Sequence, residues 1–144
     1  MILKDRYLLR ELAKQVAEVA ALPVMAQRRA MWVQHNQLRR VRPMILVFPE
    51  GSWRELLPEE ALQCEGEQAR KIEWELRRRL YHHAHLHDDA VIESIWVVPK
   101  RITQSGWGLE PRRIASPNAT GAWAFDPVIL EPADLGRLRY PEVC

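Results

Sequence analysis

The residues best suited to bind a ligand follow directly after an apolar run at residues 43–48. They are Glu50, Ser52, Trp53 and Arg54. Trp53 can stack on a flat group, and Arg54 can pair with a carboxylate or a phosphate. We therefore predict a ligand-binding segment here. The alternative is structural, with Trp53 filling the core and Arg54 pairing with Glu50 or Glu55, and the sequence leaves both interpretations open.

Glu93 is the acid that we predict to have a catalytic role. It interrupts a second apolar run, at residues 90–98. A carboxylate in a buried strand is costly unless it is paired, so Glu93 is either a site residue or the partner of a cation such as Arg101.

Tryptophan and histidine side chains offer two further candidate sites. We predict that Trp107 contributes to the ligand site, with Trp96 and Trp123 as further walls of a cavity, although aromatic residues at such intervals more often complete a core. Four histidines and two aspartates lie within residues 82–89. The best-spaced metal ligands are His83 and His87, but they share a helix face only if a helix continues that far, and the end of a helix also favours histidine cations. We predict no functional metal site here.

Two apolar runs and the helical stretch between them define the predicted fold. Residues 43–48 and 90–98 are continuous, rich in β-branched residues and followed by proline, which is typical of strands covered on both faces. Residues 68–83 can supply the helical crossover that parallel strands need. The sequence therefore predicts a βαβ unit and an α/β fold, with ligands at the carboxyl ends of the strands.

Apolar residues at helical spacing predict two helices before this unit. The first, with Asp5 as its cap, ends near residue 22, and the second covers residues 23–38. In the crossover stretch, the arginines at residues 77–79 lie among glutamates, which favours an ion-paired helix face over a nucleic-acid site.

Turn-forming residues predict a β-hairpin in the last third of the chain. Residues 109–114 and 122–130 would pair, with the turn near residues 117–121 and a short helix near residue 134. No linker or repeat divides the chain, so we predict a single domain over residues 1–144.

Composition narrows the function and the compartment. The chain has 144 residues and a formal net charge of only +2, which gives little support for nucleic-acid binding. Its two cysteines, Cys64 and Cys144, form no CxxC pair, which favours a cytoplasmic location. No run approaches the ~20 apolar residues of a membrane span, so we predict no membrane partner.

The order of these segments resembles the amino-terminal part of the uroporphyrinogen decarboxylase superfamily, which includes methylcobamide:coenzyme M methyltransferases. The run at residues 42–56, Arg-Pro-Met-Ile-Leu-Val-Phe-Pro-Glu-Gly-Ser-Trp-Arg-Glu-Leu, is similar to one in uncharacterised bacterial members. Further similarities are Ile-Trp-Val-Val-Pro at residues 95–99, the pair Gly106 and Gly108, and a segment from Asp134 to Glu142. The resemblance implies the first part of a (β/α)₈ barrel.

Three departures from the family pattern bear on activity. Phe48 and Ser52 stand where the family has arginines that hold porphyrinogen carboxylates, and Ser94 stands where it has the catalytic aspartate. The resemblance thus implies a relative of the corrinoid-dependent methyltransferases that is not itself a competent decarboxylase and is inactive alone.

The length of the chain shapes the expected partners. A (β/α)₈ barrel needs ~250 residues, so the resemblance implies a truncated or split amino-terminal part. We expect a homo-oligomer or a second chain that completes the barrel, and no cofactor in this chain, although the completed assembly could hold a corrinoid or zinc. The alternative is a stand-alone, self-associating structural or ligand-binding α/β protein without catalysis.

Overall fold

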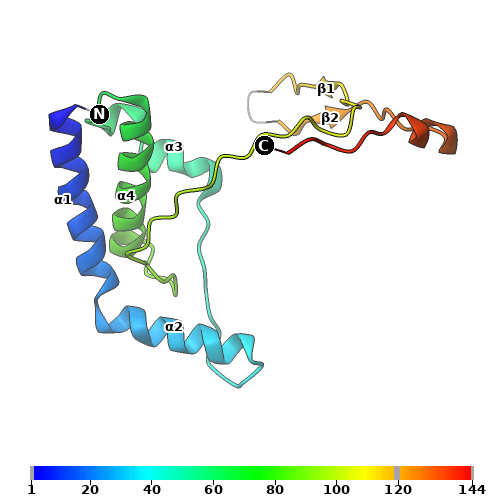
Figure 1. Ribbon diagram of the computed structural model, residues 1–144. Helices are drawn as coiled ribbons and strands as arrows, with labels where there is room; N and C mark the ends of the chain where they lie inside the picture. The colour runs from blue at the N-terminus through cyan, green and yellow to red at the C-terminus, as the bar shows by residue number, and fades with distance from the viewer. Residues whose placement is uncertain (1, 119–120, 144) are drawn as a thin grey trace. The chain divides into compact units, whose positions relative to one another are not determined.

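The computed structural model describes residues 2–118 and 121–143 (Figure 1). The chain forms two compact units, Met1–Trp96 and Val97–Cys144. The first unit is helical, and the second contains a small antiparallel hairpin. Both candidate sites described below lie in the first unit.

Three helices build the first unit. They are α1 (Leu3–Ala20), α2 (Pro23–Asn36) and α4 (Glu67–His85). Helices α1 and α4 lie side by side with their N-terminal ends together (Figure 1). Proline at the first position of α2 has the fixed φ that a helix start requires. The predicted helices are confirmed, with ends within about three residues of the expected positions.

The core of the first unit lies mainly between α1 and α4. Each helix places an apolar stripe at helical spacing against the other, and α2 adds the fully buried Met25. The buried core residues are Leu9, Leu12, Val16, Met25, Cys64, Ala69, Leu76 and Ile92.

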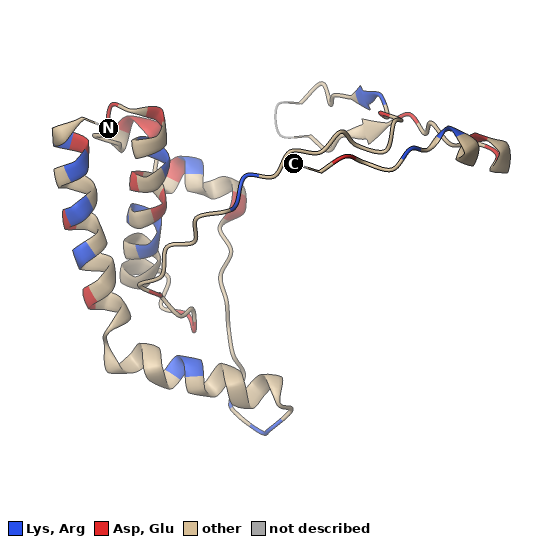
Figure 2. Ribbon diagram, in the orientation of Figure 1, with Lys and Arg blue, Asp and Glu red and all other residues tan. Residues whose placement is uncertain are grey.

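The arginines of α4 form ion pairs with glutamates of the same helix, as the sequence predicted, although one of these glutamates, Glu73, is buried. Arg77 pairs with Glu73, and Arg78 and Arg79 both pair with Glu75. Figure 2 shows acidic and basic residues interspersed along this helix.

Short helical turns connect the long helices. A 3₁₀ turn, Glu50–Ser52, leads into α3 (Trp53–Leu56), and another, Glu59–Ala61, precedes the loop to α4. Glu50 has a φ of 47°, in the left-handed region, which is uncommon for a residue other than glycine.

The predicted βαβ unit is wrong. The structure has no strand at residues 43–48 or 90–98, and the only sheet in the described residues is the two-stranded hairpin of the second unit. The helix between the two runs is present as α4, but most residues of the two runs are exposed, and Ile92 alone packs into the helical core. Phe48 is 74% exposed and Val98 is 80% exposed, so neither run is a buried strand, and no part of a (β/α)₈ barrel is formed.

The hairpin of the second unit is shorter than predicted. Strand β1 (Arg113–Ile114) pairs antiparallel with β2 (Ala124–Phe125), with Arg113 opposite Phe125. Residues 119–120 of the expected turn lie outside the described residues. The short helix expected near residue 134 is a 3₁₀ helix, Pro132–Arg137, which begins with a capping box between Glu131 and Asp134.

Candidate functional site

Residues 43–48, hereafter the open segment, expose apolar side chains and part of their backbone. Figure 1 shows the segment as a long irregular trace between α2 and α3. Ile45, Leu46, Val47 and Phe48 are all at least 38% exposed. A β-branched, apolar segment in this state is unusual, because such residues normally pack in a sheet.

Two buried carboxylates bind one edge of the open segment. Asp89 accepts the N–H of Ile45 at 2.9 Å, and the N–H of Asp89 donates to the carbonyl of Ile45 at 2.9 Å. Asp88 accepts the N–H of Val47 at 2.8 Å. The carboxylates thus take the place of a neighbouring strand and exclude strand pairing at this edge.

The opposite edge of the open segment has no partner. Among the described residues, the backbone N–H and C=O groups of Met44, Leu46 and Phe48 make no hydrogen bond. Alternate residues of an extended chain direct these groups to opposite edges. The segment therefore has one satisfied edge and one edge that can still accept a strand.

Ion pairs and helix α2 fix this arrangement. Arg42 binds Asp89 through both terminal nitrogens, one of them at 2.8 Å, and together with the Ile45 N–H it lowers the pKa of Asp89 to about 2. Burial alone would raise the pKa of Asp88, but the N–H groups of Val47 and Ala90 and the ring of His82 lower it below its usual value. From α2, Trp32 donates to the carbonyl of Asp89 at 2.8 Å.

The second apolar run is exposed from Glu93 onwards, and this corrects the expectation that Glu93 lies in a buried strand. The Glu93 side chain is 51% exposed and pairs at 3.4 Å with Arg29, not with Arg101. Arg79 donates to the carbonyls of Glu93 and Ile95, both at 3.0 Å. Glu93 is therefore an exposed, ion-paired residue and not a carboxylate buried in a strand.

Sequence reasoning missed two further carboxylates that bind loop backbone. Asp5 does not cap its own helix: it accepts the N–H groups of Glu65 and Gly66, each at 3.1 Å, at the start of α4. A Cβ on Gly66 would approach the Asp5 carboxylate at 3.3 Å, so glycine leaves room for this contact. Glu73, which is fully buried, accepts the N–H of Cys64 at 2.7 Å. The sequence did contain a sign of these contacts: Asp5 and Glu73 each occupy a position on the apolar face of their helix.

A hollow of about 620 Å³ contains three of the predicted ligand-binding residues, and we call it the Trp53 hollow. Its lining residues are Glu50, Trp53, Arg54, Leu57, Pro58, Glu59, Glu60 and Trp74. Trp53 is only 8% exposed, and its ring lies 6.2 Å from that of Trp74, edge to face. Trp53 is thus largely buried, in line with the alternative that it fills the core, and it also forms a wall of the hollow.

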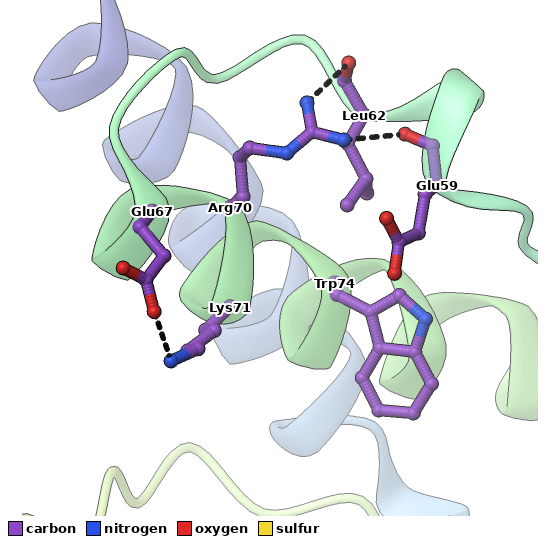
Figure 3. Close-up of a pocket in the computed structure, with 6 residues that line it drawn as sticks. All are labelled: Glu59, Leu62, Glu67, Arg70, Lys71 and Trp74. Carbon is purple, nitrogen blue, oxygen red and sulfur yellow. Dashed lines mark hydrogen bonds and ion pairs between the residues drawn. The ribbon is translucent and has the colours of Figure 1, made fainter.

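A smaller hollow of about 350 Å³ shares Glu59 and Trp74 with the Trp53 hollow (Figure 3). The two cationic side chains of this smaller hollow, Arg70 and Lys71, already have partners within the chain. Lys71 pairs with Glu67 at 2.6 Å, and Arg70 donates to the carbonyls of Glu59 and Leu62 at 2.7 and 3.4 Å. Arg70 thereby holds the Glu59 backbone in place beside Trp74.

The remaining predicted site residues do not join these hollows. Ser52 is exposed and lies outside the set that lines the Trp53 hollow. Trp107 belongs to the second unit, where it is 55% exposed and its ring lies 6.3 Å from that of Tyr140.

The histidine run forms no metal centre in the described part of the chain. Helix α4 ends at His85, and His87 has a φ of 47°, so His83 and His87 do not share a helix face. His82 instead contacts Asp88 at 2.9 Å. Over residues 2–118 and 121–143, no three His, Cys, Asp or Glu side chains gather as a metal site.

Comparisons with protein-family models, curated proteins and solved structures find no match to the chain. Along the described residues, no helix is both long and apolar enough to cross a membrane.

Proposed function

We propose that the chain is a component of a larger assembly and that it binds an extended β-strand of another polypeptide along residues 43–48. The observation that carries this proposal is the one-sided hydrogen bonding of the open segment. Ile45 and Val47 have their N–H groups bound by Asp89 and Asp88, whereas the backbone groups of Leu46 are free. An added strand would pair with the free edge and bury the neighbouring apolar side chains.

The hydrogen bonds from Asp88 and Asp89 order the open segment before a partner strand binds. An unpaired edge normally fluctuates, and ordering it on binding costs free energy. Here the buried Asp88 and Asp89 hold the segment extended before a partner arrives, which lowers that cost. The partner strand should itself be apolar, because Leu46 and Phe48 present apolar side chains beside the free edge.

The family resemblance supplies a context for the assembly. We propose, on that resemblance, that the assembly is related to corrinoid-dependent methyl transfer, that any corrinoid or zinc is bound elsewhere in it, and that this chain supplies no catalytic acid. The exposed, Arg29-paired state of Glu93 supports the last point. For the compartment, we propose the cytoplasm, on the cysteine content alone.

A labelled peptide that copies residues 90–99, the other apolar run of the chain, is the probe for strand binding. We expect its fluorescence anisotropy to rise on titration with the full chain. Leu46→Pro removes the free N–H without touching the Asp88 and Asp89 contacts, and should weaken binding by about tenfold or more, whereas Leu46→Ala keeps the N–H and should weaken it far less.

The same pair of variants identifies the partner. If the chain self-associates in sedimentation experiments, and Leu46→Pro abolishes the association, the partner is a second copy. The proposal would be overturned if the Leu46→Pro and Leu46→Ala variants bound the peptide equally well. It would also be overturned if neither the wild type nor Leu46→Ala bound the peptide.

A further inference from the structure

We propose that the Trp53 hollow binds an organic cation, an ammonium group carried on a small apolar body. This ligand site is separate from the strand-binding edge and does not depend on it. The hollow has apolar walls, an excess of negative charge, and two tryptophans that already attract a cation of the chain.

The walls of the hollow suit an apolar body. Trp53 and Trp74 meet edge to face at 6.2 Å, and Leu57 and Pro58 complete the lining. A volume of about 620 Å³ falls within the range of small-molecule sites.

The charged side chains around the hollow favour a cation. Glu50, Glu59 and Glu60 carry three negative charges against one positive charge on Arg54. None of these four side chains forms an ion pair with another described residue. The adjoining smaller hollow differs, because there Lys71 neutralises Glu67. The lining of the Trp53 hollow therefore has a net formal charge of −2, from three carboxylates and one guanidinium.

The two tryptophans already hold one cation of the chain. The Arg78 guanidinium lies 5.9 Å from the ring centre of Trp53 and 5.7 Å from that of Trp74. Arg78 is outside the lining of the hollow, so the hollow itself stays free for a ligand. Cations are attracted to the faces of tryptophan rings, and carboxylates nearby strengthen the attraction.

Choline and 3,3-dimethylbutan-1-ol test the proposal, because they share one shape and differ in charge. Their binding can be followed through the indole N–H signals of Trp53 and Trp74 in nitrogen-15 NMR spectra of the full chain. We expect choline to shift both signals to saturation and to bind about tenfold more tightly than the neutral alcohol.

Matched variants locate the binding. Glu59→Gln combined with Glu60→Gln should weaken choline binding by about fivefold or more, because two of the three carboxylates are removed while the exposed positions leave folding intact. Glu18→Gln on α1 removes the same kind of charge away from the hollow and should change binding little. Equal affinity for the two probes, no saturable shift of either indole, or an equal loss in the Glu18→Gln variant would overturn the proposal.

Discussion

Glu73 shows how one buried acid can organise a loop. Its carboxylate is 0% exposed and accepts the N–H groups of Gln63 and Cys64 and the Nε–H of Arg77. Burial alone would raise its pKa, but these donors lower it below the usual glutamate value. The charge is therefore retained and stabilises the backbone that leads into α4.

Replacing Glu73 should be costly, whereas a neighbouring exposed glutamate should be dispensable. Glu73→Gln places an amide N–H₂ against backbone N–H donors and leaves Arg77 without its charge partner, so we expect a loss of about 3 kcal/mol in the free energy of unfolding. Glu67→Gln breaks the exposed pair with Lys71 on the same helix and should cost less than about 1 kcal/mol. Urea unfolding of both variants checks this, and similar losses in the two would contradict the role given to Glu73.

The lowered pKa of Asp89 should make the stability of the folded chain depend on pH. Arg42 lowers its pKa from an ordinary value of 3.8 to about 2 in the folded chain. The unfolded chain therefore binds the proton more readily, so the stabilisation is complete above the ordinary pKa and is lost as the pH falls through about 2. We expect the difference in melting temperature between wild type and Asp89→Asn to be largest near neutral pH and to shrink towards pH 2.

An exposed aspartate of the second unit serves as the control for this effect. Asp126→Asn should give a small difference in melting temperature at every pH, because Asp126 is exposed and forms no ion pair with a described residue. A difference for Asp89→Asn that stays constant from neutral pH to pH 2 would contradict the account.

The helices could be predicted from the sequence, whereas the two apolar runs were wrongly predicted to be buried strands. The apolar stripes of α1 and α4 face each other across a core, so periodicity alone located both helices. The run at residues 43–48 has strand-forming residues, but a strand also needs a neighbour. Asp88 and Asp89, which sequence reasoning considered only as metal ligands, bind the backbone in place of one. Such a long-range contact leaves no periodic pattern.

Because the open segment is exposed, a substitution in it can distinguish the observed helical fold from the βαβ unit expected from the sequence. Phe48 is 74% exposed, so Phe48→Ala should change the free energy of unfolding by less than about 0.5 kcal/mol. Leu12→Ala, in the core between α1 and α4, should cost about 2–5 kcal/mol. Were residues 43–48 a buried strand, the two substitutions would cost similar amounts in denaturant unfolding.

For the candidate site, the sequence located the region but not its geometry. Glu50, Trp53 and Arg54 do line one hollow, as a strand-to-loop position suggested, although the strand is absent. Trp74, Glu59 and Glu60 were not predicted, because they reach the hollow from α4 and from a 3₁₀ turn. Only packing of these separate elements brings the residues together.

The first unit, taken as a whole, is a helical scaffold that holds an unpaired edge. The core between α1 and α4 supplies its stability, and four buried carboxylates fasten the connecting segments to it. Exposed apolar side chains are a liability for a free chain unless they are covered by a partner. This combination is the main support for our proposal that the chain is a component of an assembly.

Hydrogen exchange of individual amides along residues 44–48, followed by NMR, tests that claim most directly. We expect alternation in the free chain: the amides of Ile45 and Val47 exchange slowly because Asp89 and Asp88 bind them, and those of Met44, Leu46 and Phe48 exchange rapidly. Uniform protection of all five amides would show a segment already paired on both edges, and uniformly rapid exchange would show that the carboxylates do not hold it. Either result would contradict the proposed strand-accepting edge.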